Sequence, residues 1–288
     1  MTGFALELDS PEIQTTNYEL RITNKRFVSS NSFAKKAVQI NHNSSNHMIT
    51  LENVGMEYTR GHPVLKNVSL KLERGSFHFL TGASGAGKST LLSLLSLQAR
   101  PTRGNINMFG QNVTIMPRKD LPKLRRRIGI VLQDYRLLDH LTVAENVALP
   151  LKVMGEKDKR ITPKVLELLD WIGLAEHQNA KPATLSGWQK QRTAIARAVI
   201  TNPDILLADE PTGNLDSHLA QRLMYLFEAL NQAGTTVLIA SHDEHLISLF
   251  NYPTLRLQDG SLAKVQPAFP VVSKHANQHP QSSEELKK

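Results

Sequence analysis

The sequence contains no cysteine among its 288 residues. This absence excludes a disulfide framework, a thiolate metal site and thiol redox chemistry, and it is typical of a reducing cytoplasm. No apolar run reaches about eighteen residues without interruption, so no segment is expected to span a bilayer unaided. The N-terminus lacks a basic segment followed by an apolar stretch and predicts no secretory signal. If the protein works at a membrane, we expect it to be recruited there.

The composition, with 40% hydrophobic and 21% charged residues, is that of a soluble globular protein with a substantial core. The length allows one large domain, or one compact domain with flexible ends. A net charge of +8 favours an anionic partner, whether nucleotide, nucleic acid or acidic membrane surface. The basic run from Lys119 to Arg127 favours a solvated helix face, because it lacks the interleaved aromatic residues of a nucleic-acid site.

One stretch carries a specific nucleotide signal. Residues 82–89 read Gly-Ala-Ser-Gly-Ala-Gly-Lys-Ser and fit G-x-x-x-x-G-K-[ST] without a mismatch. A short apolar run at 76–80 predicts a buried strand before the loop, and a leucine-rich helix opens after it. The glycines let backbone N–H groups surround a phosphate chain at a helix N-terminus. We therefore expect a bound nucleoside triphosphate, with Lys88 at the β- and γ-phosphates and Ser89 on Mg²⁺.

Polar residues at the ends of other predicted strands complete a hydrolytic site. Asp209 and Glu210 follow an apolar run, where Asp209 is expected to hold Mg²⁺ through water and Glu210 to act as general base. His242 ends another strand and can contact the γ-phosphate or align the attacking water. Gln133 ends a third and can reach Mg²⁺ or water. The competing interpretations, a solvated acidic pair and a structural histidine, lose weight beside a matched phosphate loop.

A second motif identifies the family that the sequence resembles. Leu185-Ser186-Gly187-Trp188-Gln189 resembles the signature of the ATP-binding cassette (ABC) ATPases, and Gly213-Asn214-Leu215-Asp216 is similar to their D-loop. The resemblance covers about residues 49–264, with the motifs in the family's order. It implies a head-to-tail homodimer in which each ATP lies between one subunit's phosphate loop and the other's signature. The residues implied to act in trans are Ser186, Gly187, Trp188, Gln189 and Asp216.

The same resemblance gives Tyr58 a role in stacking on the adenine. The ordinary interpretation is a half-buried strand tyrosine, and the place of Tyr58 ahead of the phosphate loop favours the adenine contact. The implied cofactors are ATP and Mg²⁺. We expect ATP to be bound by Tyr58, Gly82, Ala83, Ser84, Gly85, Ala86, Gly87, Lys88, Ser89 and Thr90. The expected metal ligands are Ser89, Gln133 and Asp209, and the expected catalytic residues are Glu210, His242 and Gln133.

The expected fold class is α/β, a P-loop NTPase of ABC type with a mixed central sheet. Short alternating strands over 49–81 predict an antiparallel β-subdomain, and residues of about 134–190 predict an inserted helical subdomain. Together they form one ATPase domain over residues 48–264. Residues 1–47, which are polar and without a period, and the Pro-, His-, Gln- and Ser-rich residues 265–288 are expected to be disordered. Met48 is a possible true start of the chain.

Helix-capping signals divide the predicted helical insert. Thr142 and Glu145 form a capping box at the start of one helix. Thr162 followed by Pro163 predicts the start of another, which ends at Gly173.

Within the ABC ATPases, residues 133–138, 142–151 and 210–216 together resemble the FtsE family of bacterial cell-division ATPases. That resemblance implies a membrane partner of the FtsX type, bound in a groove near Gln133 and the helical insert. It also implies a subunit that transmits ATP-driven conformational change across the membrane to cell-wall hydrolases, with no solute carried. The protein would lie peripherally on the cytoplasmic face of the bacterial inner membrane, touching lipid mainly through its partner.

Three alternatives stay open to different degrees. Lipoprotein-release and macrolide-export ATPases share the motif at 210–216. DNA-maintenance cassettes, which would suit the basic charge, insert a coiled coil or zinc module between phosphate loop and signature. Here the spacing from Lys88 to Ser186 is that of an ordinary cassette, so no nucleic acid is expected. A weakly hydrolysing or non-hydrolysing scaffold at the division site is the third, because of Trp188.

Trp188 occupies the place of the second signature glycine and is the clear departure from the family pattern. Ser186 and Gln189 form a capping box, which makes Trp188 the second helical residue with ordinary helical dihedral angles. Backbone strain is therefore not expected, and the bulk of the indole is the concern. We expect a signature that folds normally but closes poorly on ATP, with a low basal ATPase rate. The alternative is an indole swung aside and full activity.

Overall fold

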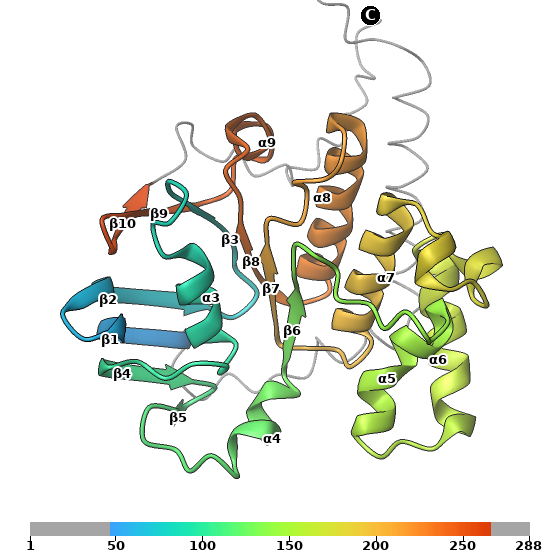
Figure 1. Cartoon of the computed structure of the whole chain (residues 1–288), viewed down its shortest axis with the longest axis horizontal. Coiled ribbons are helices and arrows are strands. Elements are labelled where there is room, and N and C mark those ends of the chain that lie inside the picture. The colour runs from blue at the N-terminus through green and yellow to red at the C-terminus, as the bar shows by residue number, and fades with distance from the viewer. Residues whose placement is uncertain (1–46, 266–288) are drawn as a thin grey trace, which may run out of the picture.

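The computed structural model describes residues 47–265. The disorder expected for residues 1–47 and 265–288 lies outside the described residues, apart from His47 and Val265, which belong to the first and last strands. Two sheets and the helices packed on them make up the described chain (Figure 1).

The smaller sheet is antiparallel and has the strand order β2-β1-β4-β5. Along β2, Leu65, Val68, Leu70 and Leu72 are all buried, and most of the residues between them are exposed. This alternation places one face of the strand in the core and confirms the predicted antiparallel subdomain. The strands are β1 (His47–Thr59), β2 (His62–Glu73), β4 (Arg103–Met108) and β5 (Gln111–Asn112).

The larger sheet is mixed, with the order β10-β9-β3-β8-β7-β6. Strands β9, β3, β8, β7 and β6 are mutually parallel, and β10 adds an antiparallel edge. In a parallel sheet the carboxyl ends of all strands meet at one edge, where ligands bind. The strands are β3 (Phe77–Thr81), β6 (Ile128–Val131), β7 (Ile205–Asp209), β8 (Thr236–Ala240), β9 (Thr254–Gln258) and β10 (Ser261–Val265).

The central strands are buried on both faces and separate two hydrophobic clusters. In β7, Leu206 and Ala208 belong to one cluster, and Ile205 and Leu207 belong to the other. The second cluster also contains α3 (Lys88–Leu95) and the antiparallel sheet. The continuous apolar runs of these strands are therefore explained by cover on both sides.

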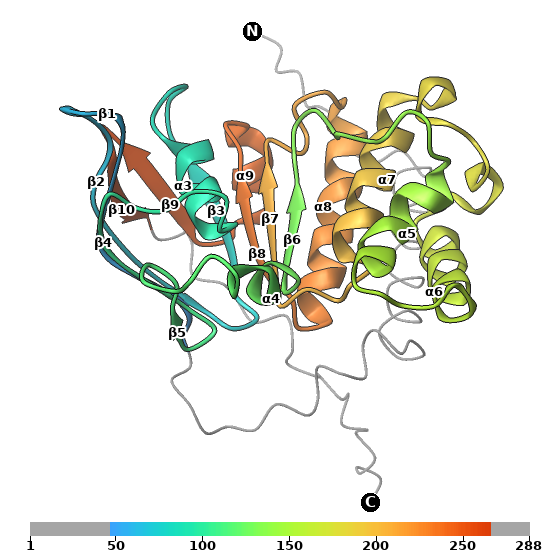
Figure 2. The ribbon, with the colours of Figure 1, turned by 60° about the horizontal axis from the view of Figure 1, so that its bottom comes forward.

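The first cluster joins the large sheet to the long helices, which follow one another outward from its opposite face (Figure 2). These helices are α5 (Val143–Val153), α6 (Asp158–Trp171), α7 (Gly187–Val199) and α8 (Ser217–Gln232). Shorter elements are α4 (Leu121–Arg125), α9 (Glu244–Phe250) and the 3₁₀ helices η2 (Ala175–His177) and η3 (Pro182–Thr184). None of the helices described between residues 47 and 265 is long and apolar enough to cross a membrane.

The prediction for the start of α6 was wrong. The helix begins at Asp158, so Thr162 and Pro163 lie inside it, and the Thr162 hydroxyl donates to the Asp158 carbonyl (3.1 Å). The buried face of α6 begins with Ile161. An extra turn before Pro163 places that side chain in the core, and tertiary packing has overridden the local signal.

The basic run was also more than a solvated helix face. The helix there covers Leu121–Arg125 alone, and two of the arginines bind the protein itself. Arg125 donates to the carbonyl of Leu97 (2.7 Å). Arg127 pairs with Asp204 (2.6 Å) and lies 3.9 Å from the ring centre of Phe109. Arg127, just before β6 of the large sheet, therefore contacts the residue that follows β4 of the small sheet.

Candidate nucleotide site

The phosphate loop joins β3 to α3 at the carboxyl edge of the large sheet. Gly87, the residue that caps α3, has φ +103°, and an added Cβ would lie 2.9 Å from Leu65. Gly82 has φ +152°, and its Cβ would lie 2.3 Å from the carbonyl oxygen of Leu257. Both positions therefore require glycine. No side chain caps the start of α3, which leaves its first N–H groups available to an anion.

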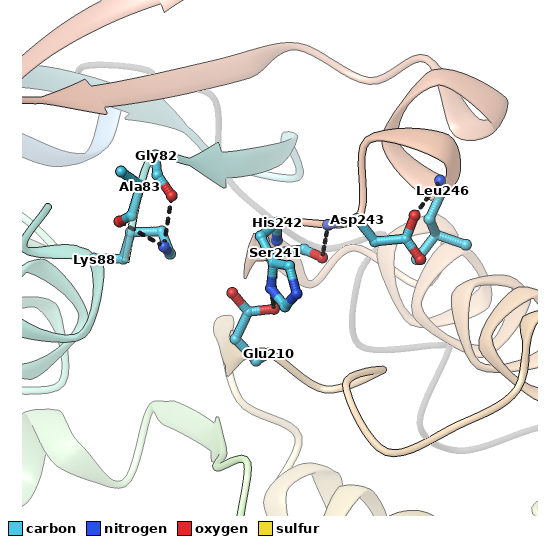
Figure 3. A network of polar contacts seen from close by, with 8 residues as sticks. All are labelled: Gly82, Ala83, Lys88, Glu210, Ser241, His242, Asp243 and Leu246. Carbon is cyan, nitrogen blue, oxygen red and sulfur yellow. Dashed lines mark hydrogen bonds and ion pairs between the residues drawn. The ribbon is translucent and has the colours of Figure 1, made fainter. Parts of the chain in front are cut away.

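Lys88 is held across this loop by the loop's own backbone. Its Nζ donates to the carbonyls of Gly82 (2.7 Å) and Ala83 (3.2 Å), as Figure 3 shows. An ammonium group fixed beside open N–H groups forms a phosphate-binding arrangement. Among the other predicted loop residues, Ala83, Ser84, Gly85 and Ser89 are exposed, and Thr90 is buried.

Asp209 brings a carboxylate to the first turn of α3. It ends β7, and its side chain lies beside Ser89. The pKa of the Asp209 carboxyl is raised overall, mainly by burial. Glu210 raises it further, whereas Ser89 and Lys88 lower it. A hydroxyl and a carboxylate oxygen are ligands that Mg²⁺ accepts. Within residues 47–265, no three His, Cys, Asp or Glu side chains gather into a metal site. Mg²⁺ is commonly held by one or two carboxylates together with substrate phosphates and water.

Glu210 and His242 meet because β7 and β8 are neighbours. The Glu210 Oε2 lies 2.8 Å from His242 Nδ1 (Figure 3). The Glu210 side chain is 13% exposed, and His242 is 72% exposed. Glu210 has φ +45°, an uncommon value for a non-glycine residue. The contact fixes the orientation of a carboxylate that can accept a proton from water.

The backbone around His242 is held by hydrogen bonds on both sides. The Ser241 N–H donates to the Leu80 carbonyl (3.1 Å), and the Ser241 Oγ accepts from the Asp243 N–H (3.2 Å). Asp243 then caps α9 through the N–H of Leu246 (2.9 Å). The histidine is thus carried on a short turn that is fixed at both ends.

Tyr58 is not the half-buried strand residue of the ordinary interpretation. It lies near the end of β1 and is 65% exposed, and its hydroxyl donates to Thr90 Oγ1 at 3.4 Å. The ring is thereby placed beside the first turn of α3 with its surface open to solvent. A ring in this position is free to stack on a base.

The signature residues form the capping box that the sequence predicts. Ser186 Oγ accepts from the Gln189 N–H (3.2 Å), and Gln189 Oε1 accepts from the Ser186 N–H (2.8 Å). Trp188 is the second residue of α7 and does not have positive φ. Its indole packs partly buried against the helical cluster, with the Arg192 guanidinium 4.9 Å from the ring centre. Burial and then Arg222 lower the pKa of Arg192 to about 10.

The single chain does not bring its signature to its own phosphate loop. The helix α3 packs in the cluster on one face of the large sheet, and α7 packs in the cluster on the other (Figure 1). Lys88, Ser89 and Asp209 come together at the edge of the sheet, and Glu210 with His242 lies beside them. Asp216 caps α8 through the Leu219 N–H (2.9 Å).

Two residues that hold the segment after Gln133 could not be predicted from the sequence. Arg197 of α7 donates to the carbonyls of Tyr135 and Arg136, each at 2.7 Å, and both of these residues have positive φ. Asn146 of α5 is fully buried, and its amide bonds the backbone of Leu138, Leu141 and Thr142. Arg197 contacts residues that are 61 and 62 positions away in the chain, whereas Asn146 bonds the start of its own helix and the loop just before it. An arginine or asparagine in a helix carries no local sign of either role.

Gln133 itself is exposed, and its Nε2 faces the D-loop. A Cβ added to Gly213 would lie 3.9 Å from that nitrogen. The D-loop and the end of β6 therefore lie close together.

Comparisons with known proteins agree with this geometry. A family model described as "ABC transporter" matches residues 65–213. The chain belongs to the ABC transporter family. Among the ABC proteins that it resembles, the cell division ATP-binding protein FtsE of Escherichia coli is 45% identical over 215 residues, which are 75% of this chain and 97% of that protein. The protein of the same name from Mycobacterium tuberculosis is 42% identical over 218 residues, 75% of this chain and 95% of its own.

Solved ABC structures share the fold. A dimeric post-hydrolysis state of the ATP-binding cassette MJ0796 bound to ADP and Pi superposes with a TM-score of 0.70 at 36% identity. The match covers 76% of this chain and 98% of that one. The expected fold class, an ABC-type P-loop NTPase with mixed and antiparallel sheets, is confirmed.

Proposed function

We propose that the protein is the ATP-binding and hydrolysing subunit of an FtsE/FtsX-like membrane complex that acts in cell division. In this complex it would transmit ATP-driven conformational change across the membrane to cell-wall hydrolases. The observation that carries the proposal is the 45% identity to FtsE over 97% of that protein. The contact of Glu210 with His242 beside the phosphate loop supports hydrolysis.

The proposed chemistry assigns each side chain one task. The loop N–H groups and Lys88 bind the phosphates, and Ser89 and Asp209, with Gln133, would hold Mg²⁺. That ion, when bound, neutralises charge that develops on the β- and γ-phosphates. Glu210 accepts a proton from the attacking water, and the His242 contact holds its carboxylate in place. Tyr58 stacks on the adenine.

The proposed active form is a head-to-tail homodimer on ATP. The separation of α7 from α3 by the large sheet supports it, because a second copy could supply the signature that the chain does not bring to its own loop. The dimeric state of MJ0796 is a structural precedent. Ser186 and the N–H groups of Gly187 and Trp188 would face the γ-phosphate in trans, with Gln189 closing the capping box on Ser186 and Asp216 of the D-loop nearby.

A low basal ATPase rate, set by Trp188, is a finer part of the proposal. The indole lies one residue into the helix end that would meet the partner's phosphate, where a glycine leaves space. Its packing against the helical cluster and Arg192 favours the alternative, an indole turned aside with full activity. The two outcomes differ in the rate of Trp188→Gly, which is predicted in the Discussion.

A groove of about 480 Å³ supports a docking site for the membrane partner. It lies among α4, β6, α5 and α7, and Val153 (73% exposed) and Met154 (37% exposed) contribute to its apolar lining. Arg197 lines the same groove while it holds the backbone after Gln133. An amphipathic helix of an FtsX-type protein fits such a surface, and it would place the ATPase peripherally on the cytoplasmic face of the inner membrane.

Membrane fractionation tests this attachment. We expect Val153→Lys to lower the membrane-bound fraction in cells that contain the partner, because it puts a charge into an apolar contact. Ile115→Lys is the matched control, since Ile115 is 76% exposed and lies outside the groove. If the protein binds membranes equally well without the partner and is released by high salt, the basic run Lys119–Arg127 on anionic lipid is the better account.

A further inference from the structure

The side chain of Gln189 has two partners, and one of them lies outside the signature. Its Oε1 accepts from the Ser186 N–H at 2.8 Å, which closes the capping box. Its Nε2 lies 2.9 Å from Nε2 of His177, a half-buried residue of the 3₁₀ helix η2. Both ends of the amide are therefore engaged, and the second bond is made by a residue with no part in the motif.

The capping box decides which atoms donate. A backbone N–H can only donate, so the oxygen of the Gln189 amide must face Ser186 and the nitrogen must face His177. The amide nitrogen also only donates. Nε2 of His177 must therefore accept, which makes the ring neutral with its proton on Nδ1.

The turn that carries His177 is fixed to the start of α5. The Val143 N–H donates to the carbonyl of Ala180 (2.9 Å), and the Ala144 N–H donates to the carbonyl of Gln178 (2.9 Å). These are the first two N–H groups of α5, which have no partner inside the helix. Helix α5 thus holds the 177–180 turn, and the turn holds His177 against Gln189.

We propose that His177 is a positioning residue for the signature. By accepting from Gln189, it keeps that side chain in the rotamer that closes the capping box, and so fixes Ser186 and the first N–H groups of α7 for the γ-phosphate of ATP bound to a second copy. His177 itself touches neither nucleotide nor water in the reaction. This inference rests on the proposed head-to-tail dimer for its consequence and on the observed contacts for its geometry.

Three variants in a Glu210→Gln background, which retains ATP, test the role. His177→Phe keeps a ring but removes the acceptor, and His177→Gln returns an acceptor oxygen at a similar reach. His140→Phe is the control, because His140 is exposed in the same subdomain. ATP-dependent dimerisation is measured by light scattering, and ATP binding to the monomer by fluorescence titration. Thermal unfolding is followed for each.

We expect His177→Phe to weaken dimerisation by about 25-fold, because one neutral hydrogen bond is worth about fivefold and a symmetric dimer contains two signatures. ATP binding to the monomer should stay within about twofold, since the phosphate loop is unchanged. His177→Gln should recover most of the dimerisation, and His140→Phe should match the parent. Unimpaired dimerisation of His177→Phe, or equal loss in both His177 variants, would overturn the proposal.

Amide hydrogen exchange keeps this test separate from the proposed function. Exchange of the Ser186 N–H in the monomer should be about fivefold faster in His177→Phe, because the capping bond opens more often, and it should be restored in His177→Gln. If the Glu210→Gln parent does not dimerise with ATP, the proposed dimer is wrong. The role of His177 is then tested by the exchange rate alone. An unchanged exchange rate in His177→Phe would contradict the positioning role in either case.

Discussion

Helices α3 and α7, whose first N–H groups are proposed to bind phosphate, begin in opposite ways. Helix α3 starts from Gly87 in a left-handed conformation with no side-chain cap. Helix α7 starts from Ser186 in an extended conformation, and a reciprocal capping box satisfies its N–H groups in part. The first helix relies on glycine and an open end, whereas the second relies on side chains that order its end in advance.

This difference explains why a tryptophan is tolerated in one motif and would not be in the other. Gly87 has φ +103° and lies against Leu65, so a side chain there would be strained and crowded. Trp188 is the second residue of a capped helix with ordinary dihedral angles, and its indole packs against Arg192. At Gly87 the backbone conformation itself requires glycine. At position 188 the backbone is ordinary helix, so a glycine would differ from Trp188 only in the space that it leaves.

Replacing Glu210 should have the greatest effect, because hydrolysis should be lost while ATP still binds at the phosphate loop. Glu210→Gln should lower the ATPase rate by about 10²–10⁴-fold, because it removes the proton acceptor beside His242. ATP affinity should be retained, and the nucleotide-bound dimer should accumulate. Steady-state phosphate release and light scattering measure the two effects. Wild-type turnover in this variant would contradict the role of Glu210 as general base.

The next effect tests the open helix end itself. Lys88→Ala should weaken ATP binding about tenfold to hundredfold, because a charge-assisted phosphate contact of about 1.5–3 kcal/mol is lost. Equilibrium titration with a fluorescent ATP analogue measures the affinity. Lys190→Ala, which changes a lysine of α7, is the matched control and should leave binding to the monomer unchanged. Equal affinities of Lys88→Ala and wild type would remove Lys88 from the site.

The smallest effect concerns the capped helix end. If the indole crowds the interface by about 1 kcal/mol, Trp188→Gly should raise the basal ATPase rate about fivefold. Trp188→Ala controls for the helix stability that glycine removes, about 1 kcal/mol. Rates are measured with and without the membrane partner. An unchanged rate in both conditions would end the crowding hypothesis and leave an indole that lies aside.

Local motifs were predictable from the sequence because their geometry is set within a few residues. The capping boxes at Thr142 and Ser186 form as expected. The start of α6 was not predicted, because the burial of Ile161 outweighed the signal at Thr162 and Pro163. The local pattern failed where a distant contact decided the outcome.

The residues that support the site could not be predicted from the sequence for the same reason. Arg197 and His177 act through bonds to a segment far away in the chain or to another helix, and Asn146 acts on the folded loop just before its own helix. Their own neighbours in the sequence form no motif. The basic run is the opposite case. Its pattern is typical of solvated charge, yet Arg127 is bound to Asp204.

In the proposed dimer, one copy's phosphate loop works with another copy's signature. Mixing two inactive variants tests this arrangement. Lys88→Ala disables the loop, and Ser186→Asp keeps a good helix cap but puts negative charge where the γ-phosphate would bind. If the signature acts in trans, a mixed dimer has one doubly defective site and one intact site. Random mixing makes about half of the dimers mixed, so about a quarter of the wild-type ATPase rate should return. A mixture as inactive as its components would contradict the account.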